Sequence, residues 1–490
     1  MPNKYFTKRD LQAILDGTIN KTFGQVDKND VFMIAENNSK VTGIAGIVVE
    51  QSVLEYPKDN RQEADLIVDD SEVELKVTGL RRKNGSTNQE YTAKEPMSIT
   101  AVSPEYIVDE TFYTSHFWNK IAKMLIVYYL YNSDKTVKAK DYANFPILGY
   151  DLHEFSQKDV EILKNDWTIV RDFIKNVQDN GLDKNIYYPE ISHLRNQLLY
   201  LDTAPKWPHS PRFRFRRAFV DTIAQEYFGK QFELIPTEIT SLSELLEFLN
   251  TLKKKYKGKT ILEITSELGI KPSTSTGNFS KSIGEQIIAA VFGSKSKKMR
   301  NVELFSKLGI IPKTLILSNK SKRTEDTKFG RVDFDEYKEI NQKFENSSVY
   351  EYFSQSKFLF AIFKEVTPNA PLADDIFVDF NLFSFPSEFI ETDLQRTWKE
   401  IKDRIVNHTF EEKVIRDKEG NPITNKNGVV RTAINLPKSR TNKVFVRGTS
   451  SNSSYKPLNV QGISMYIQQY WIKGNVMVEM LENNPDSSAE

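Results

Sequence analysis

The stretch Asp65–Lys76, DLIVDDSEVELK, decides the fold of the first half of this 490-residue chain. Three apolar residues lead into the polar cluster DDS, and a run that alternates valine or leucine with charged residues follows it. A turn signal between two β-branched runs predicts a hairpin with the two adjacent aspartates in its loop. Antiparallel pairing around that loop sets Asp65 opposite Glu74, and Lys76 follows two residues further along the same face.

Two carboxylates whose Cβ atoms lie about 5 Å apart repel each other unless a cation lies between them. A hard divalent ion such as Mg²⁺, which takes oxygen ligands and retains water, suits Asp65 and Glu74. A lysine beside the ion can orient or deprotonate a water and stabilise charge that develops on a phosphate. The pattern therefore predicts the D…E-x-K site of a metal-dependent nuclease. A solvated hairpin face is the alternative, because 27% of the residues are charged.

Composition narrows the class of protein. The chain is long enough for two or three domains, and its 39% hydrophobic and 12% aromatic residues are typical of a folded protein. It has no cysteine, which excludes disulfides and thiolate metal sites and suits a reducing cytoplasm. The N-terminus MPNKYFTKRD lacks the apolar segment of a signal peptide, and the apolar run Met124–Tyr131 is too short to span a bilayer. We therefore expect a cytoplasmic protein without a membrane partner.

The most basic stretch with interleaved aromatic residues is Pro205–Phe219, PKWPHSPRFRFRRAF. The net charge of the whole chain is only +1, so a surface for DNA phosphates has to come from such a local cluster. Arginine forks bind phosphates and guanine edges bidentately, which makes a strand here a candidate DNA contact. An amphipathic strand with one solvated arginine face is the alternative. The candidate residues are Arg212, Arg214, Arg216 and Arg217.

The order of segments occurs twice in the chain. Trp167–Ile174, WTIVRDFI, reappears as Trp398–Ile405, WKEIKDRI, and each copy ends a predicted helix at a similar distance after an apolar strand. In the same order, GIAGIVVEQ corresponds to SIGEQIIAA, VELKVT to IIPKT, and FRFRRAF to YWIKGNV. An ordered series of weak matches indicates a duplicated domain. We expect domains over 1–235 and 276–490, joined by a partly helical connector over 236–275.

The second copy lacks the residues that would carry the chemistry. The corresponding pairs are Glu74 and Ile311, Glu50 and Ile288, and Lys120 and Ser354. An active first copy and a second copy that only binds explain this difference, whereas a purely solvated surface gives no reason for it beyond drift.

The segments GIAGIVVE, EADLIVDDSEVELKVT, SHFWNKIAKMLIVYY, SHLRNQ and PRFRFRRAFVDTI together resemble the MutH family, especially the Sau-type type II restriction endonucleases. The resemblance implies an α/β fold with a mixed α+β sheet, the PD-(D/E)XK fold, in two tandem restriction-endonuclease-like domains of which the second is degenerate. It implies Mg²⁺-dependent double-strand cleavage of DNA at a short site, GATC in the best-known members. The implied partners are double-stranded DNA and a cognate DNA methyltransferase as genetic partner, with a monomer in solution that associates on two DNA sites.

The resemblance also assigns site residues. The implied catalytic set is Asp65 and Glu74 as metal ligands, Lys76 as catalytic lysine, Glu50 as accessory carboxylate and Lys120 as accessory lysine. In the second copy, Val446-Arg447 matches the base-reading loop of the family and suggests a site for an effector DNA. The further candidate DNA contacts are Arg195, Gln197, Arg447 and Lys473.

The sequence departs from the family pattern at three places, which affect the assignment of Asp65 and of the base-reading residues. The spacing from Asp65 to Glu74 is longer than in MutH, the small-residue run before S-L-R-N-Q is not evident, and Gly448 stands where a proline is usual. GATC is therefore the family default for the recognised site. Two other functions stay open: a MutH-like repair nickase that needs a partner, and a non-catalytic DNA-binding protein made of two degenerate nuclease domains.

Overall fold

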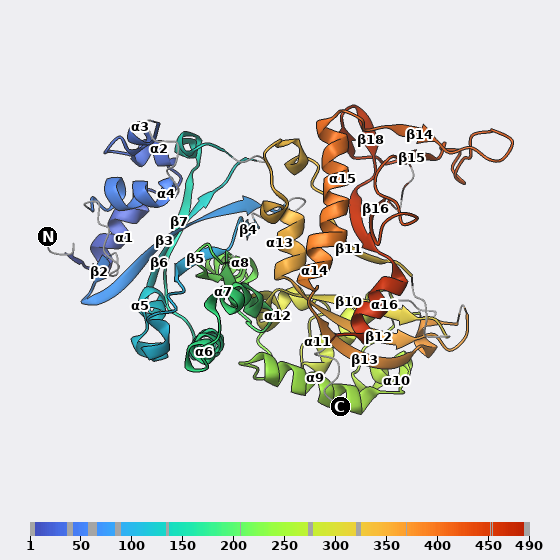
Figure 1. The fold of residues 1–490 in the computed structure, drawn as a ribbon, viewed down its shortest axis with the longest axis horizontal. Helices are drawn as coiled ribbons and strands as arrows, with labels where there is room; N and C mark the ends of the chain where they lie inside the picture. Colours follow the sequence, from blue (N-terminus) through green and yellow to red (C-terminus); the bar gives the residue numbers. More distant parts are fainter. Residues whose placement is uncertain are drawn as a thin grey trace. The chain divides into compact units, whose positions relative to one another are not determined.

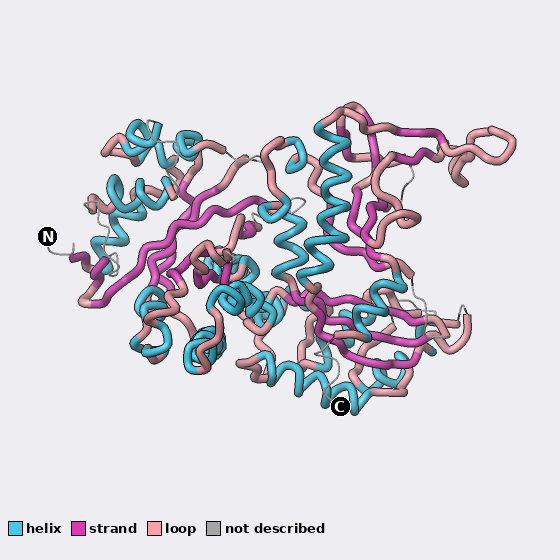
Figure 2. Tube along the Cα trace, in the orientation of Figure 1, coloured by secondary structure: helices cyan, strands magenta, loops and turns pink. Residues whose placement is uncertain are grey.

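The computed structural model describes residues 5–36, 43–56, 66–83, 90–133, 137–205, 207–272, 278–319, 325–368, 370–450, 452 and 454–484 (Figures 1 and 2). The chain forms two compact units. Unit 1 comprises Met1–Leu245 and Arg300–Gly309, and unit 2 comprises Leu246–Met299 and Ile310–Glu490. Among the described helices, none combines the length and the apolar character needed to cross a membrane.

Unit 1 is built on a mixed sheet with the strand order β1-β2-β3-β6-β7, in which β4 also pairs with β3. The strands are β1 (Tyr5–Phe6), β2 (Leu66–Val68), β3 (Ser71–Arg82), β4 (Tyr91–Ala93), β6 (Met124–Leu130) and β7 (Ile147–His153). The long β3 runs parallel to β6, and β6 runs antiparallel to β7. The predicted strand at the apolar run is confirmed, because all seven residues of β6 are buried.

The predicted hairpin is confirmed for β2 and β3. Val68 lies opposite Ser71, so the loop consists of the two residues Asp69 and Asp70. Their φ angles are 45° and 62°, and positive φ at both central positions is what a two-residue type I′ turn requires. Asp65 lies outside the described residues, one position before the first described pair of the hairpin, so its predicted place remains a prediction.

The period-2 alternation along β3 separates two faces of the sheet. Val73 and Leu75 pack into a core with the helices α1, α2, α3 and α4. Glu74 and Lys76 belong to the opposite face, and α5 contacts this strand. The bounds of these helices are α1 (Lys8–Asp16), α2 (Phe23–Val26), α3 (Val31–Glu36), α4 (Ile44–Val48) and α5 (His116–Ile121).

A second, smaller sheet of unit 1 has the order β5-β9-β8, with both pairs antiparallel. Its strands are β5 (Met97–Ala101), β8 (Leu201–Ala204) and β9 (Arg212–Phe215). The long helix α6 (Gln157–Asp179) precedes this sheet, and α8 (Arg217–Tyr227) follows β9 after one residue.

Unit 2 repeats this connectivity, which confirms the predicted duplication. β10 runs parallel to β12, β12 runs antiparallel to β13, and a second sheet has the order β11-β19-β16. The elements are α11 (Ile283–Val291), β10 (Ile310–Leu317), β11 (Thr327–Arg331), α13 (Ser348–Gln355), β12 (Lys357–Lys364), β13 (Ile376–Phe383), α15 (Gln395–Val406), β16 (Val444–Gly448), β19 (Gln468–Ile472) and α16 (Gly474–Glu482). The expected connector contains α9 (Leu242–Tyr256) and α10 (Ile261–Glu267). Trp167 and Trp398, the marker residues of the repeat, are both buried, in α6 and α15.

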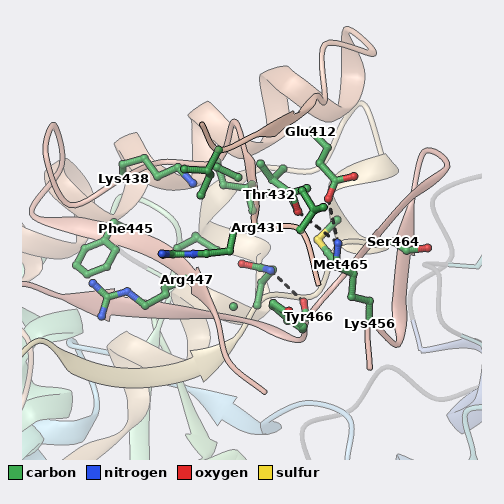
Figure 3. A pocket seen from close by; sticks show the side chains of 18 of the residues that line it. Glu412, Arg431, Thr432, Lys438, Phe445, Arg447, Lys456, Ser464, Met465 and Tyr466 are labelled. Carbon is green, nitrogen blue, oxygen red and sulfur yellow. Dashed lines mark hydrogen bonds and ion pairs between the residues drawn. The ribbon is translucent and has the colours of Figure 1, made fainter. Parts of the chain in front are cut away.

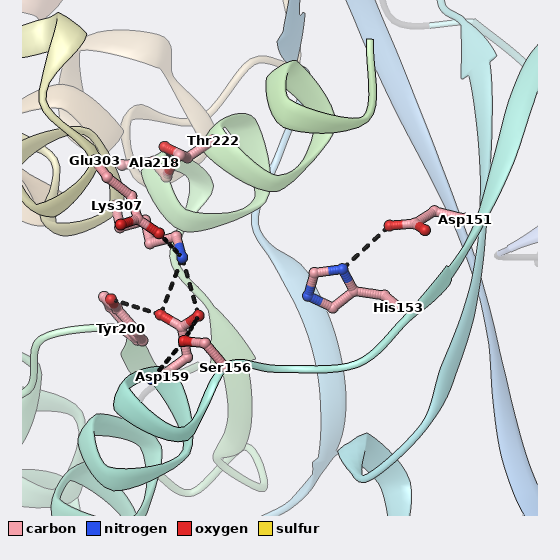
Figure 4. A network of polar contacts seen from close by, with 9 residues as sticks. All are labelled: Asp151, His153, Ser156, Asp159, Tyr200, Ala218, Thr222, Glu303 and Lys307. Atoms are coloured by element: carbon pink, nitrogen blue, oxygen red, sulfur yellow. Dashed lines mark hydrogen bonds and ion pairs between the residues drawn. The ribbon is translucent and has the colours of Figure 1, made fainter. Parts of the chain in front are cut away.

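One short segment from the second half of the chain is grouped with unit 1. In α12 (Glu303–Leu308), which packs on α8, the Lys307 side chain is only 6% exposed. Its Nζ lies 2.9 Å from Oδ2 of Asp159 at the start of α6 and 2.6 Å from Glu303 (Figure 4). The Tyr200 hydroxyl donates to the same aspartate at 2.9 Å. The structure therefore differs from the expected boundaries, which placed this segment in the second domain.

Candidate active site

The centre of the candidate site is the carboxylate of Glu74, which is 4% exposed. Its Oε1 accepts a hydrogen bond from Nζ of Lys76 at 2.7 Å, and its Oε2 accepts one from Nζ of Lys120, also at 2.7 Å. Two ammonium groups thereby offset the cost of burying one carboxylate. The structure thus brings three residues of the predicted set, Glu74, Lys76 and Lys120, together around a single point.

The lysine on α5 reaches Glu74 because of how β3 and β6 pair. Glu74 lies opposite Met124 in the parallel register, and its N–H donates to the carbonyl of Lys123 at 3.0 Å. Lys120 lies in the last turn of α5, just before β6 begins. The start of that helix is capped by Ser115, whose Oγ accepts the N–H of Trp118 at 3.0 Å. The proximity of Lys120 to Glu74 therefore follows from the pairing of β3 with β6.

Glu74, Lys76 and Lys120 line a cleft of about 970 Å³, a volume at the upper end of the range of ligand pockets. The cleft lies between β3, α5, β5, β9 and α6. Its other residues with polar or aromatic side chains include Glu72, Tyr106, Glu110, His116, Trp167 and Arg212. Charged groups of both signs therefore face one open space.

The donor set allows a partial test of the predicted metal site. Glu74 offers hard carboxylate oxygens at the edge of the cleft, as a divalent ion such as Mg²⁺ requires. Within the described ranges, no three His, Asp or Glu residues are grouped so that they could hold a metal ion. The second predicted ligand, Asp65, lies outside those ranges. Glu74 fits one ligand position, and the remaining protein ligand has to come from another carboxylate.

The accessory carboxylate Glu50 lies in a different pocket. Helix α4 continues into the π-helical turn η1 (Val49–Val53), and Glu50 lines a pocket of about 430 Å³ together with Lys76 and Glu95. A π-helical turn of this kind is frequent at functional sites. In unit 2 the corresponding helix α11 is regular, and Ile288 is buried in it.

The predicted strand of the arginine stretch is present, but it is shorter than expected. β9 ends at Phe215, and Arg216 is the N-cap residue of α8. The Arg216 side chain is buried, and its guanidinium donates to the carbonyls of Leu201 (2.9 Å), Leu198 (3.1 Å) and Arg195. Burial lowers the pKa of Arg216. The prediction that Arg216 contacts DNA is therefore wrong, because its donors hold together the loop before β8.

Two neighbouring arginines also have partners within the fold. Arg214 forms an ion pair with Asp202, its cross-strand neighbour on β8. Burial acts to raise the pKa of that aspartate, but Arg214, Arg195 and Arg216 together outweigh it and the pKa is lowered. Arg217 donates from Nε to the carbonyl of Ala93 at 2.8 Å and so ties α8 to β4. These contacts fix the positions of the Arg214 and Arg217 side chains.

Arg212 differs from the other arginines of this stretch, because it is exposed and lines the same cleft as Glu74. Its Nε donates to Oγ of Ser98 at 2.7 Å. Of the two candidate base readers in the turn η5 (Tyr188–Asn196) and just after it, Arg195 is half-buried and Gln197 is exposed. Arg212 and Gln197 are thus the most accessible DNA-contact candidates in unit 1.

In unit 2, the candidate Arg447 lies at an open pocket of about 480 Å³ (Figure 3). Its guanidinium bonds Asp326 at 2.9 Å and lies 4.9 Å from the ring centroid of Trp471. The other basic residues of the pocket are Arg431, Lys438 and Lys456. Lys473 is half-buried at the N-cap of α16, the position that Arg216 has at α8.

The strand register of unit 2 identifies the residues that lie at the positions of Glu74 and Lys76. Ile311 lies opposite Phe358, as Glu74 lies opposite Met124, so Lys313 has the position of Lys76. Lys313 donates to the carbonyl of Lys328 at 2.6 Å, and burial lowers its pKa to about 8. Unit 2 therefore has a lysine at the position of Lys76 but no carboxylate at the position of Glu74.

Two comparisons with known proteins found similar proteins. Residues 54–166 match the family described as DNA mismatch repair enzyme MutH, and this range contains Glu74, Lys76 and Lys120. The chain is 25% identical over 456 residues to the type II restriction enzyme Sau3AI of Staphylococcus aureus, over 84% of this chain and 87% of that enzyme. Since 84% of the chain is more than either unit holds, this match extends over parts of both units.

Together, the α/β fold and these matches support a site-specific DNA endonuclease. The chain is similar to MutH over residues 54–166 and to the restriction enzyme Sau3AI over most of its length.

Proposed function

We propose that this protein is a type II restriction endonuclease that makes Mg²⁺-dependent cuts in both strands of DNA at a short site, GATC by family default. The observation that carries the proposal is the buried Glu74, held by Lys76 and Lys120 at the wall of an open cleft. A cognate DNA methyltransferase as genetic partner, a cytoplasmic location and a monomer that associates on two DNA sites belong to the same proposal.

In the proposed mechanism, Glu74 and Asp65 hold the divalent cation. When bound, this ion supplies positive charge for the scissile phosphate and makes a water more acidic. Lys76 orients the attacking water, and Lys120 stabilises negative charge that builds up on the phosphate. Because both ammonium groups already lie at 2.7 Å from Glu74, they need little rearrangement to act at one phosphate.

For unit 2, we propose binding of a second, effector copy of DNA. The support is the basic pocket at Arg447, together with the replacement of Glu74 by Ile311 at the equivalent strand position. Arg212, Arg214, Arg217, Arg195 and Gln197 in unit 1 and Arg447 and Lys473 in unit 2 remain the proposed DNA contacts.

Incubation of the purified protein with plasmid DNA and Mg²⁺ is expected to give discrete linear fragments. Lys76→Ala should give none, because it removes the ammonium that orients the water, and excess EDTA should also stop cleavage. Gel analysis of methylated and unmethylated plasmid, followed by sequencing of the ends, identifies the site. A smear, or full activity of the variant, would refute the mechanism.

The same digestion separates the two other functions. A MutH-like nickase converts supercoiled plasmid to the open circle, and only when a repair partner is added. A non-catalytic DNA-binding protein leaves the plasmid intact, and its binding needs no metal and weakens steeply with salt.

The arginines of β9 and α8 are expected to respond differently to substitution. Arg212→Ala should weaken DNA binding by roughly 3- to 30-fold and leave the melting temperature unchanged, because the side chain is exposed at the cleft. Arg216→Gln should lower the free energy of unfolding by about 2–4 kcal/mol, because buried carbonyls lose their donors. Fluorescence anisotropy and urea unfolding test the pair, and equal effects on stability would contradict the assignment.

A further inference from the structure

A histidine and a glutamate that sequence analysis did not select line the Glu74 cleft. His116 is the first residue of α5, and Glu110 follows the 3-10 turn η2 (Ile107–Asp109). Nδ1 of His116 bonds Oε1 of Glu110, which also accepts the backbone N–H of His116 at 3.2 Å. The glutamate side chain is 16% exposed and the imidazole 62% exposed. The largely buried carboxylate of Glu110 therefore orients the exposed imidazole of His116 at the cleft.

The helix α5 relates this imidazole to the reaction centre. His116 and Lys120 are four residues apart, so they share one face of the helix with their Cβ atoms about 5–6 Å apart. Lys120 bonds Glu74. A DNA strand whose scissile phosphate lies at Glu74 and Lys120 would therefore carry a neighbouring phosphate past His116.

The duplicated unit provides an internal comparison. Ser115 and Ser347 are equivalent N-caps, since each accepts from the N–H three residues on and donates to a phenylalanine carbonyl of the preceding turn. The residue after the cap is His116 in unit 1 and Ser348 in unit 2. The N–H of Ser348 donates to Glu336 at 2.7 Å, so a carboxylate also lies at the start of this helix. What unit 2 lacks is the imidazole, together with the catalytic carboxylate.

We propose that His116, oriented by Glu110, binds the phosphate next to the scissile one on the cleaved strand; this inference rests on the proposed endonuclease function. An imidazolium donates from both ring nitrogens. With Nδ1 engaged by Glu110, Nε2 is the ring nitrogen left for the phosphate, and in the imidazolium form its N–H donates to a phosphate oxygen in a charge-assisted hydrogen bond. Glu110 is a positioning residue that fixes which nitrogen faces the ligand.

The test pairs changes in the protein with changes in the DNA. The full-length protein and His116→Ala are titrated, with Ca²⁺ replacing Mg²⁺, against duplexes that carry one neutral methylphosphonate at each position around the cut. One flanking position should weaken the parent protein roughly 10-fold and leave the variant unaffected. On plasmid DNA, the slope of log K against log salt should fall by about 0.9 in the variant.

Two further variants separate binding from folding. Glu110→Gln keeps an acceptor for the backbone N–H but removes the charge, and it should show a reduced effect at the same phosphate. Glu336→Gln, the matched change in unit 2, should leave the profile of the cleaved duplex unchanged. His116→Ala should melt at the same temperature as the parent, because the backbone N–H of residue 116 still reaches Glu110.

The outcomes are distinguishable from failure of the proposed function. If no plasmid is cut, the endonuclease proposal fails, and the salt slope on plasmid DNA still tests His116. If plasmid is cut but parent and His116→Ala share one methylphosphonate profile and one salt slope, the phosphate contact does not exist. A lower melting temperature with an unchanged profile would make His116 a structural residue and overturn the inference.

Discussion

Glu74→Gln is expected to reduce the rate of DNA cleavage by about 10³-fold or more. Glutamine has nearly the same shape, but it carries no charge to hold a cation between Lys76 and Lys120. DNA binding without metal should persist or tighten, because the cleft loses a negative charge beside two ammonium groups. Single-turnover cleavage and fluorescence anisotropy measure the two effects separately.

Glu72→Gln is the matched control. Glu72 precedes Glu74 by two residues on β3, lines the same cleft and is exposed. We expect a change in cleavage rate below about 5-fold, since a surface charge in this position acts only through long-range electrostatics. Comparable losses in both variants would mean that the total negative charge of the cleft, and not cation binding by Glu74 in particular, supports cleavage.

Lys307→Met is expected to lower the free energy of unfolding of unit 1 by about 3–5 kcal/mol, because it leaves the buried carboxylate of Asp159 without its cation. Burial acts to lower the pKa of Lys307, but Asp159 and Glu303 outweigh it and raise the pKa above its usual value. The folded state thus holds this proton more tightly than the unfolded chain. The contribution is present below about pH 10.5 and is lost as the pH rises further.

Hydrogen exchange of the full-length protein, read in peptides from α6 and α8, measures the predicted loss, because α12 packs on α8 and its Lys307 pairs with Asp159 of α6. The control is Lys253→Met in unit 2, whose pair with Asp379 at 3.2 Å is partly exposed and should contribute less than about 1 kcal/mol. In the double variant Asp159→Asn with Lys307→Met, part of the stability should return, since no unpaired charge remains. An unchanged exchange pattern in Lys307→Met would show that α12 is not an integral part of unit 1.

The same segment bears on how the nuclease is built. A chain that ends at Leu245 lacks residues 300–309, and with them the partner of Asp159 and the cover of α8. The sequence suggested a boundary at residue 235, because the repeated segments begin again after it. The compact unit also includes Arg300–Gly309, whose Lys307 is buried against Asp159, so the nuclease half depends on ten residues from beyond the connector.

Much of the site could be predicted from the sequence, because it depends on short-range patterns. Alternation along β3 places Glu74 and Lys76 on one face, and two aspartates of positive φ close the hairpin. The repeat of ordered segments was sufficient to predict that the second half keeps the strand connectivity and lacks the carboxylate, as Ile311 shows.

Other features were decided by the tertiary structure alone. Lys120 reaches Glu74 through the parallel pairing of β3 with β6, and Arg216, predicted as a DNA contact, is instead buried among carbonyls of a loop 15 to 21 residues earlier. Lys307 joins an aspartate 148 residues before it. Periodicity and turn chemistry act within a few residues and can therefore be recognised from the sequence alone. Burial and charge pairing between distant segments depend on which surfaces meet, and that is settled only when the chain is folded.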